Sequence, residues 1–117
     1  MKIEYYRLRS MPYAQCHVEL SVDNSGLFKS VTLVSYRTKI LTLNYTDEVW
    51  CTVNYPVDCS STTARHVNSF TSEFLGRNLY HELKRMGKGS SKCYEGVFYT
   101  CMAQVQWYVK HGKHFHY

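Results

Sequence analysis

The segment 14–55 constrains the fold most, because residues 14–22 alternate between apolar and polar with a period of two and further β-branched and aromatic runs follow them. That period is typical of half-buried β-strands. The letters DNSG at 23–26 are a strong turn signal, and the later connections are equally short. The segment therefore predicts an antiparallel meander, to which residues 2–8 can add an edge strand. The predicted strands are 14–22, 28–36, 39–45 and 49–55.

The pattern changes period after Pro56, which cannot donate to a sheet and so ends the last strand. Beyond it, apolar residues recur at helical spacing and Gly76 follows as a natural stop, so a helix is predicted over 61–75. A second helix is predicted over 77–86 on the same grounds. The letters KGSSK at 88–92 then predict a loop.

The segment 93–109 is compatible with two structures. As a strand it alternates without a break, and as a helix it presents one apolar stripe that includes Cys101, Val105 and Tyr108. Gly112 would suit a helix C-terminus. The unbroken alternation favours the strand, and the helix stays open as the alternative.

These segments together indicate an α+β fold, since a run of strands is followed by helical segments. We expect an antiparallel sheet of four to five strands with one or two helices packed on one face. The 117 residues are 44% hydrophobic, enough to fill one core. Residues 1–117 are therefore predicted to form a single domain.

The letters CSSTTARHVNSF at 59–70 allow two interpretations. Cys59 and Arg65 have the spacing of a cysteine phosphatase loop, in which a thiolate lies beneath the phosphate and an arginine grips its oxygens. The loop has no glycine to turn its N–H groups inward, and the preceding strands are expected to be antiparallel. A cysteine-dependent phosphatase, with Asp58 or Asp47 as its acid, is thus the less favoured alternative.

The same letters also form the start of an ordinary amphipathic helix. Ser60 or Ser61 can accept a hydrogen bond from a backbone N–H two or three residues on, and so cap the helix. Phe70 would then dock onto the sheet. Arg65 and His66 are left near or on the outer face, and neither the cap nor the core explains them.

Two spaced motifs, SYRTKI at 35–40 and SSTTARHVNSF at 60–70, resemble a group of small phage and plasmid proteins. The resemblance covers roughly residues 26–76. It implies a mobile-element origin and a small module of sheet and helix, and it supplies no reaction and no functional residues. Some mobile-element proteins of this size inhibit host defence, so the resemblance raises anti-CRISPR function as an expectation.

The charge balance points to an acidic partner. Fourteen Lys and Arg against nine Asp and Glu give a formal net charge of +5, which favours nucleic acid or an acidic protein surface. Basic and aromatic residues interleave at 5–9, 35–39 and 108–117, as where rings stack on bases and cations meet phosphates. No recognition-helix or RNA-binding motif accompanies them. A small basic nucleic-acid-binding regulatory module is therefore an alternative function.

Histidines in the tail raise the question of zinc, which takes four nitrogen or sulfur ligands. The cysteines lack the spacing of a zinc knuckle, so a basic tail without metal or cofactor is the preferred interpretation. The residues concerned are His111, His114 and His116 with Cys51, Cys59, Cys93 or Cys101.

The sequence shows no apolar stretch of signal-peptide or membrane-spanning length and five cysteines in no secreted pattern. We therefore expect reduced thiols and a protein in the cytoplasm of a host cell, without membrane contact. The predicted function is that of a small, non-enzymatic phage or mobile-element protein that binds and inhibits or modulates a host protein, such as a CRISPR-Cas nuclease. The candidate partner-binding residues, chosen for charge and expected exposure, are Arg37, Lys39, Arg65, His66, Arg77, Lys84, Arg85, Lys88 and Lys92.

Overall fold

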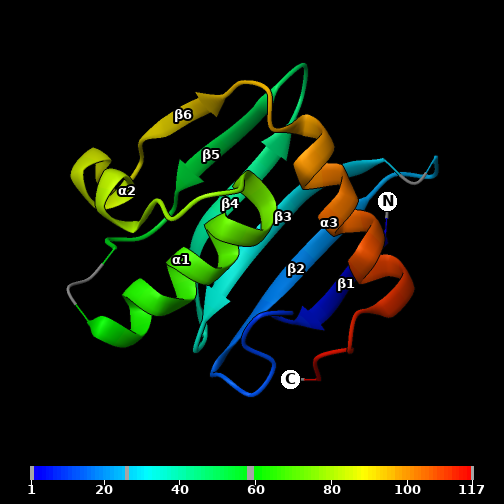
Figure 1. Ribbon diagram of the computed structural model, residues 1–117, viewed down its shortest axis with the longest axis horizontal. Coiled ribbons are helices and arrows are strands. Elements are labelled where there is room, and N and C mark those ends of the chain that lie inside the picture. The colour runs from blue at the N-terminus through cyan, green and yellow to red at the C-terminus, as the bar shows by residue number, and fades with distance from the viewer. Residues whose placement is uncertain (1, 26, 58–59, 117) are drawn as a thin grey trace.

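A computed structural model describes residues 2–25, 27–57 and 60–116. Within them, six strands form one antiparallel sheet in chain order, and helices α1 and α3 cross the same face of it (Figure 1). The strands are β1 (Lys2–Arg7), β2 (Cys16–Val22), β3 (Phe28–Ser35), β4 (Thr38–Tyr45), β5 (Val49–Val53) and β6 (Ser91–Tyr94). The helices are α1 (Ser61–Leu75), α2 (Tyr80–Met86) and α3 (Phe98–His111).

The predicted α+β class and antiparallel meander are confirmed, because each strand pairs with the next along the chain. The sheet has one strand more than expected, and one helix is added to the two predicted. The inward positions of the central strands are fully buried, with Leu33 and Leu43 among them. Phe70 and Phe74 of α1 pack against this layer, and truncating either to alanine would cost about 3–5 kcal/mol.

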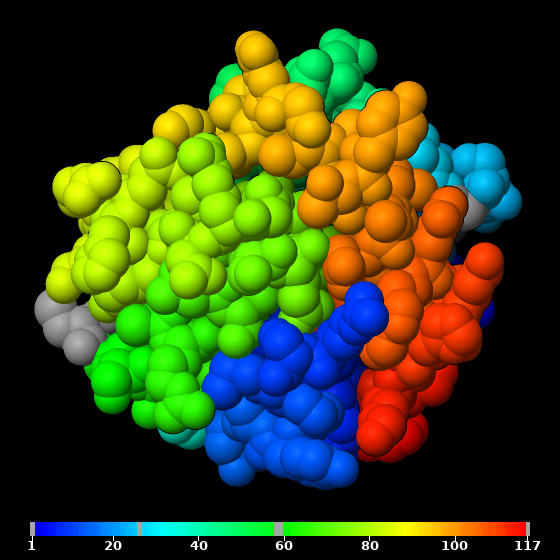
Figure 2. All heavy atoms as spheres, viewed as in Figure 1, coloured from blue at the N-terminus to red at the C-terminus, as the bar shows by residue number. Residues whose placement is uncertain are grey.

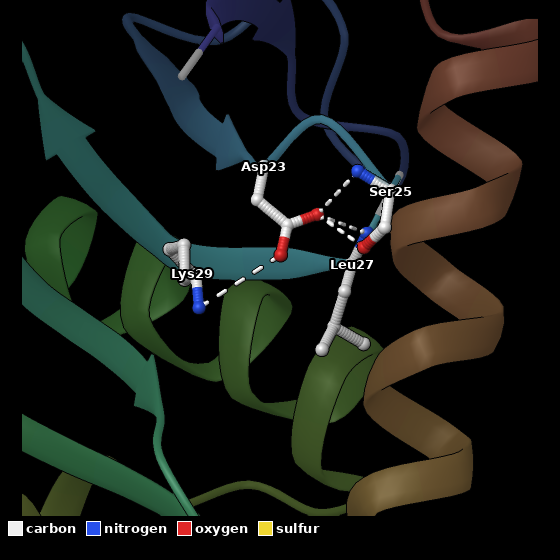
Figure 3. A network of polar contacts seen from close by, with 4 residues as sticks. All are labelled: Asp23, Ser25, Leu27 and Lys29. Atoms are coloured by element: carbon white, nitrogen blue, oxygen red, sulfur yellow. Dashed lines mark hydrogen bonds and ion pairs between the residues drawn. The ribbon is translucent and has the colours of Figure 1, made fainter.

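The turn between β2 and β3 shows why the DNSG letters end a strand. The Asp23 carboxylate accepts hydrogen bonds from the backbone N–H groups of Ser25 and Leu27, at 2.9 and 3.1 Å (Figure 3). Its second oxygen lies 3.8 Å from the Lys29 Nζ. An Asp side chain that satisfies the turn's own N–H groups stabilises this reversal of the chain.

Helix α1 has the predicted bounds and the predicted caps. The Ser60 Oγ accepts a hydrogen bond from the Thr63 N–H at 3.3 Å, and Gly76 closes the helix with a left-handed φ of 81°. A turn anchored to α1 links it to α2. The Asn68 side-chain oxygen accepts from the Tyr80 N–H at 3.1 Å, and α2 therefore begins at Tyr80 rather than at residue 77.

The preference for a strand over 93–109 is wrong. Only Ser91–Tyr94 is extended there, and a turn at Gly96 leads into α3. The helical stripe is the correct one, with Cys101, Val105 and Tyr108 buried. A strand would have directed Val109 inward, yet its side chain is exposed. The predicted loop over 88–92 is also corrected, because its last two residues pair with β5.

The chain after α3 returns to the edge of the sheet formed by β1. The Arg7 N–H donates to the Lys113 carbonyl at 2.7 Å, and the Phe115 N–H donates to the Tyr5 carbonyl at 2.9 Å. A side chain at Gly112 would collide with Tyr6, since an added Cβ would lie 2.6 Å from its ring. A glycine therefore lets residues 113–116 lie flat along β1.

No helix in the described part of the chain is long and apolar enough to cross a membrane.

Candidate partner-binding surfaces

Five of the nine predicted partner-binding residues lie along α2 and β6, at one margin of the molecule. Figure 2 shows α2, in yellow-green, on the opposite side of this face from the red C-terminal tail. All five side chains are exposed. We call this surface the basic edge, and its members are Arg77, Lys84, Arg85, Lys88 and Lys92.

Aromatic rings lie beneath several of these cations. The Arg77 guanidinium and the Lys92 ammonium lie 5.8 and 5.3 Å from the centre of the Tyr94 ring. The Lys88 ammonium lies 5.6 Å from the ring of Tyr55, which is itself half exposed. Cation–π contacts of this kind contribute about 0.5–1 kcal/mol at exposed positions and restrict where the charges lie.

Glu82 is the only carboxylate between residues 77 and 92. Lys92 donates to one of its oxygens at 2.8 Å, and the Tyr94 hydroxyl donates to the other at 2.5 Å. These hydrogen bonds, that from Lys92 first, hold the pKa of Glu82 below its usual value. One negative charge among five positive ones leaves the basic edge strongly cationic.

The other predicted contact residues lie elsewhere. Arg37 is exposed in the turn between β3 and β4, and Lys39 makes an ion pair of 3.6 Å with Glu19. Arg65 is exposed on α1 and lines a hollow of about 470 Å³. Glu73 lines the same hollow and offsets the arginine's charge. These residues do not extend the basic edge.

The expectation that His66 faces outward is wrong, because only 1% of its surface is exposed. It lies on the inner side of α1 beside Val67, and its Nδ1 is 2.8 Å from the Ser35 Oγ at the end of β3. Burial first, and the neighbouring Arg65 charge second, lower the pKa of His66. His66 is therefore a neutral packing residue rather than a partner contact.

The Ser35–His66 contact brings together the two motifs, which nineteen residues separate in the sequence. Tyr36 follows Ser35 and is the only residue other than glycine, among those described, with a positive φ, 58°. Such backbone costs about 1–2 kcal/mol for a residue with a side chain. The Tyr36 N–H donates to the Gln15 carbonyl at 2.6 Å, so contacts on both sides hold this turn.

The two-residue turn Tyr36-Arg37 carries an exposed aromatic residue, whose ring lies 6.0 Å from that of the buried His66. Turns of this kind favour glycine at the first central position, because glycine adopts a positive φ without strain. Tyr36 is 55% exposed, so burial does not account for a tyrosine at this position. A strained residue that also exposes a large ring marks a candidate functional position.

Tyr36 borders a hollow of about 640 Å³, which we call the turn hollow. Phe115, from the tail along β1, is a second ring in it, and this ring stacks on His17 with centroids 4.0 Å apart and planes 6° apart. Burial lowers the pKa of His17, so the ring behind Phe115 is uncharged at neutral pH. The residues lining the turn hollow are Gln15, Tyr36, Arg37, Thr38, Phe115 and His116.

The histidines and cysteines considered for zinc are dispersed. Among the described residues, no three of the His, Cys, Asp and Glu side chains come together as metal ligands. His114 stacks on Tyr6, and burial raises the pKa of the free thiols Cys51 and Cys101 to about 12. Cys59 and Asp58 lie outside the described residues, so the phosphatase alternative stays a prediction.

Sequence reasoning identified the cations of the basic edge but missed the turn hollow. Tyr36 belongs to the SYRT motif, and the lack of a glycine in this two-residue turn is the feature of the sequence that could have indicated the site. Gln15 and Phe115 gave no local signal, because their place in the hollow depends on contacts with distant parts of the chain.

Comparison of the chain with protein-family models, curated proteins and solved structures finds no match. The resemblance of the two motifs to phage and plasmid proteins therefore stays a prediction.

Proposed function

We propose that this protein is a small, non-enzymatic binding protein of a phage or other mobile element, which occupies a surface on a host protein through the basic edge. The observation that carries the proposal is that five exposed cations and a single carboxylate lie between residues 77 and 92, along α2 and β6. The partner's complementary surface is acidic. Positively charged surfaces steer such partners together and suppress association with basic ones.

The arrangement of the side chains supports binding as well as attraction. A flexible lysine loses conformational entropy when a partner fixes it. Here the rings of Tyr94 and Tyr55 already limit where Arg77, Lys88 and Lys92 lie. These side chains therefore lose less conformational entropy when a partner binds.

The class of partner follows from the resemblance rather than from the geometry. A cationic edge can contact acidic loops of a CRISPR-Cas nuclease or the nucleic acid that such a nuclease binds. Inhibition would result from occupying that surface. The anti-CRISPR function is proposed on this basis.

The test is affinity capture from host lysate with the tagged protein, followed by affinity measurement with the captured partner. Lys84→Glu with Lys88→Glu should weaken binding at least tenfold, because each change places a negative charge against an acidic surface. The matched control is Lys110→Glu at the end of α3 with Lys113→Glu in the tail beside β1, which alters net charge equally. Equal losses from both pairs, or none from the first, would refute a role for the basic edge.

Direct nucleic-acid binding is a second candidate, favoured by the Lys88 ammonium beside the half-exposed Tyr55 ring. A cation and a ring together can hold a phosphate and a base. This function requires that DNA or RNA binding weakens steeply as salt is raised. Absence of binding at low salt would exclude it and leave the protein-binding function in place.

A further inference from the structure

We infer that the turn hollow is a binding site for a nucleotide, either free or at an unstacked position of a single strand. This goes beyond the proposed function and uses residues that do not belong to the basic edge. The hollow of about 640 Å³ lies within the usual size range of small-ligand sites. Its lining supplies what a nucleotide needs, namely faces for a base and a positive charge for a phosphate.

The side chains that line the turn hollow have the chemistry that a nucleotide requires. Tyr36 and Phe115 contribute two rings, Arg37 a guanidinium, and Gln15 an amide that can donate and accept. No carboxylate lines the hollow among the described residues. A planar ligand with a hydrogen-bonding edge and an anionic group complements this set, because rings stack on bases and arginine binds phosphate oxygens. Glutamine amides pair with the edge of adenine, which makes adenine the first base to test.

The Tyr36 and Phe115 side chains are both in contact with other parts of the protein in the absence of a ligand. Phe115 is fixed by its N–H bond to the Tyr5 carbonyl at 2.9 Å and by parallel stacking on His17. The backbone of Tyr36 is held by the bond from its N–H to the Gln15 carbonyl, and its ring lies against the buried His66 ring, with centroids 6.0 Å apart. A site that is already ordered binds with a smaller entropic cost.

Tyr36 is also an unusual residue for its position in the turn. Glycine would relieve the backbone at φ 58°, yet the chain carries a large exposed ring there. A ring in that position has a function if it contacts a ligand, and stacking on a base is the contact that an exposed, rigid ring offers. Arg37 follows directly and brings its charge to the same hollow.

The experiment is a titration of isotope-labelled protein, followed by amide chemical shifts, with AMP, adenosine, inorganic phosphate and an eight-residue single-stranded oligoadenylate. AMP should shift the amides of residues 15, 36–38, 115 and 116, and should bind more tightly than adenosine or phosphate alone. An oligonucleotide that binds at least tenfold more tightly than AMP identifies a nucleic acid as the source, and equal affinities identify a free nucleotide. No shift at these amides with about 10 mM AMP or with the oligonucleotide would overturn the inference.

Matched variants separate the ring from the fold. Tyr36→Gly keeps the turn and removes the ring, so it should weaken AMP binding about tenfold or more, whereas Tyr36→Phe should retain it. Arg37→Gln should remove the preference for AMP over adenosine. Tyr99→Gly on α3 and Arg85→Gln on the basic edge serve as controls that leave AMP binding unchanged. Unaltered AMP binding by Tyr36→Gly, or an equal loss with Arg85→Gln, would contradict the assignment, and neither result bears on capture of a host protein by the basic edge.

Discussion

The basic edge and the turn hollow differ in how their side chains are held. The basic edge is formed by exposed cations from one continuous stretch, 77–92, and rings or Glu82 lie beside several of them. The turn hollow collects residues from the β1–β2 loop, the β3–β4 turn and the tail, and buried groups such as His66 fix it from within. Substitutions in the basic edge should therefore leave the fold intact, whereas substitutions around the turn hollow should also affect the packing of the core.

The largest expected effect separates the two regions by stability. His66→Ala removes a buried ring and leaves the Ser35 hydroxyl without its 2.8 Å partner, so it should lower the free energy of unfolding by about 2–4 kcal/mol. Lys84→Ala on the basic edge should change it by less than about 0.5 kcal/mol. Urea unfolding of both variants measures this. Similar losses in the two would show that the basic edge is also structural.

Acid should weaken the turn region before it affects the basic edge. Burial lowers the pKa of His17 and of His66 in the folded protein, below the usual value of about 6.5. As pH falls below 6.5 the unfolded chain takes up protons that the folded chain does not, so stability decreases. Lysine and arginine side chains keep their charge throughout this range.

The measurement is urea unfolding at pH 7.5, 6.5 and 5.5. His66→Asn should reduce the dependence on pH, because it removes one of the two buried rings whose pKa burial lowers. A stability that stays constant from pH 7.5 to 5.5 would argue against neutral, buried histidines behind the turn hollow.

Substitutions at Tyr36 in the strained turn should change stability less, and glycine should be the more stable replacement there instead of alanine. Tyr36→Gly and Tyr36→Ala both remove the ring, but only glycine relieves a φ of 58°. The glycine variant should therefore be more stable than the alanine variant by about 1 kcal/mol, measured by thermal or urea unfolding. At an ordinary helix position such as Arg85, the order of the two substitutions should reverse.

Local patterns predicted most of the fold, because the alternation of strands and the caps of α1 depend on residues a few positions apart. Ser60 and Gly76 act as their identities indicate. Residues 93–109 were ambiguous because both periods fit the same letters, and packing of Cys101, Val105 and Tyr108 against the rest of the core decides in favour of the helix.

The candidate sites were predictable to different extents for the same physical reason. The basic edge lies within one short stretch, so charge alone located it. The burial of His66 depends on Ser35, which is 31 residues away, and the turn hollow depends on a tail that returns to β1. Contacts between residues so far apart in the chain cannot be predicted from a local sequence pattern.

The smallest expected effect concerns the one carboxylate of the basic edge. Glu82→Gln removes the negative charge and one of the two oxygens that accept from Lys92 and Tyr94, and because the Lys92 pair is partly exposed the cost should be only about 0.2–1 kcal/mol. The lowered pKa of Glu82 means that its contribution is present above the usual value of about 4.5 and is lost as pH falls through the folded value. The difference between wild type and Glu82→Gln should thus be smaller in acid than at neutral pH, as unfolding at pH 7 and pH 3 can measure. The same variant raises the charge of the basic edge by one, so it should strengthen capture of an acidic partner while it weakens the fold. If the basic edge binds through geometry fixed by Glu82 rather than through charge, the variant will instead bind less tightly.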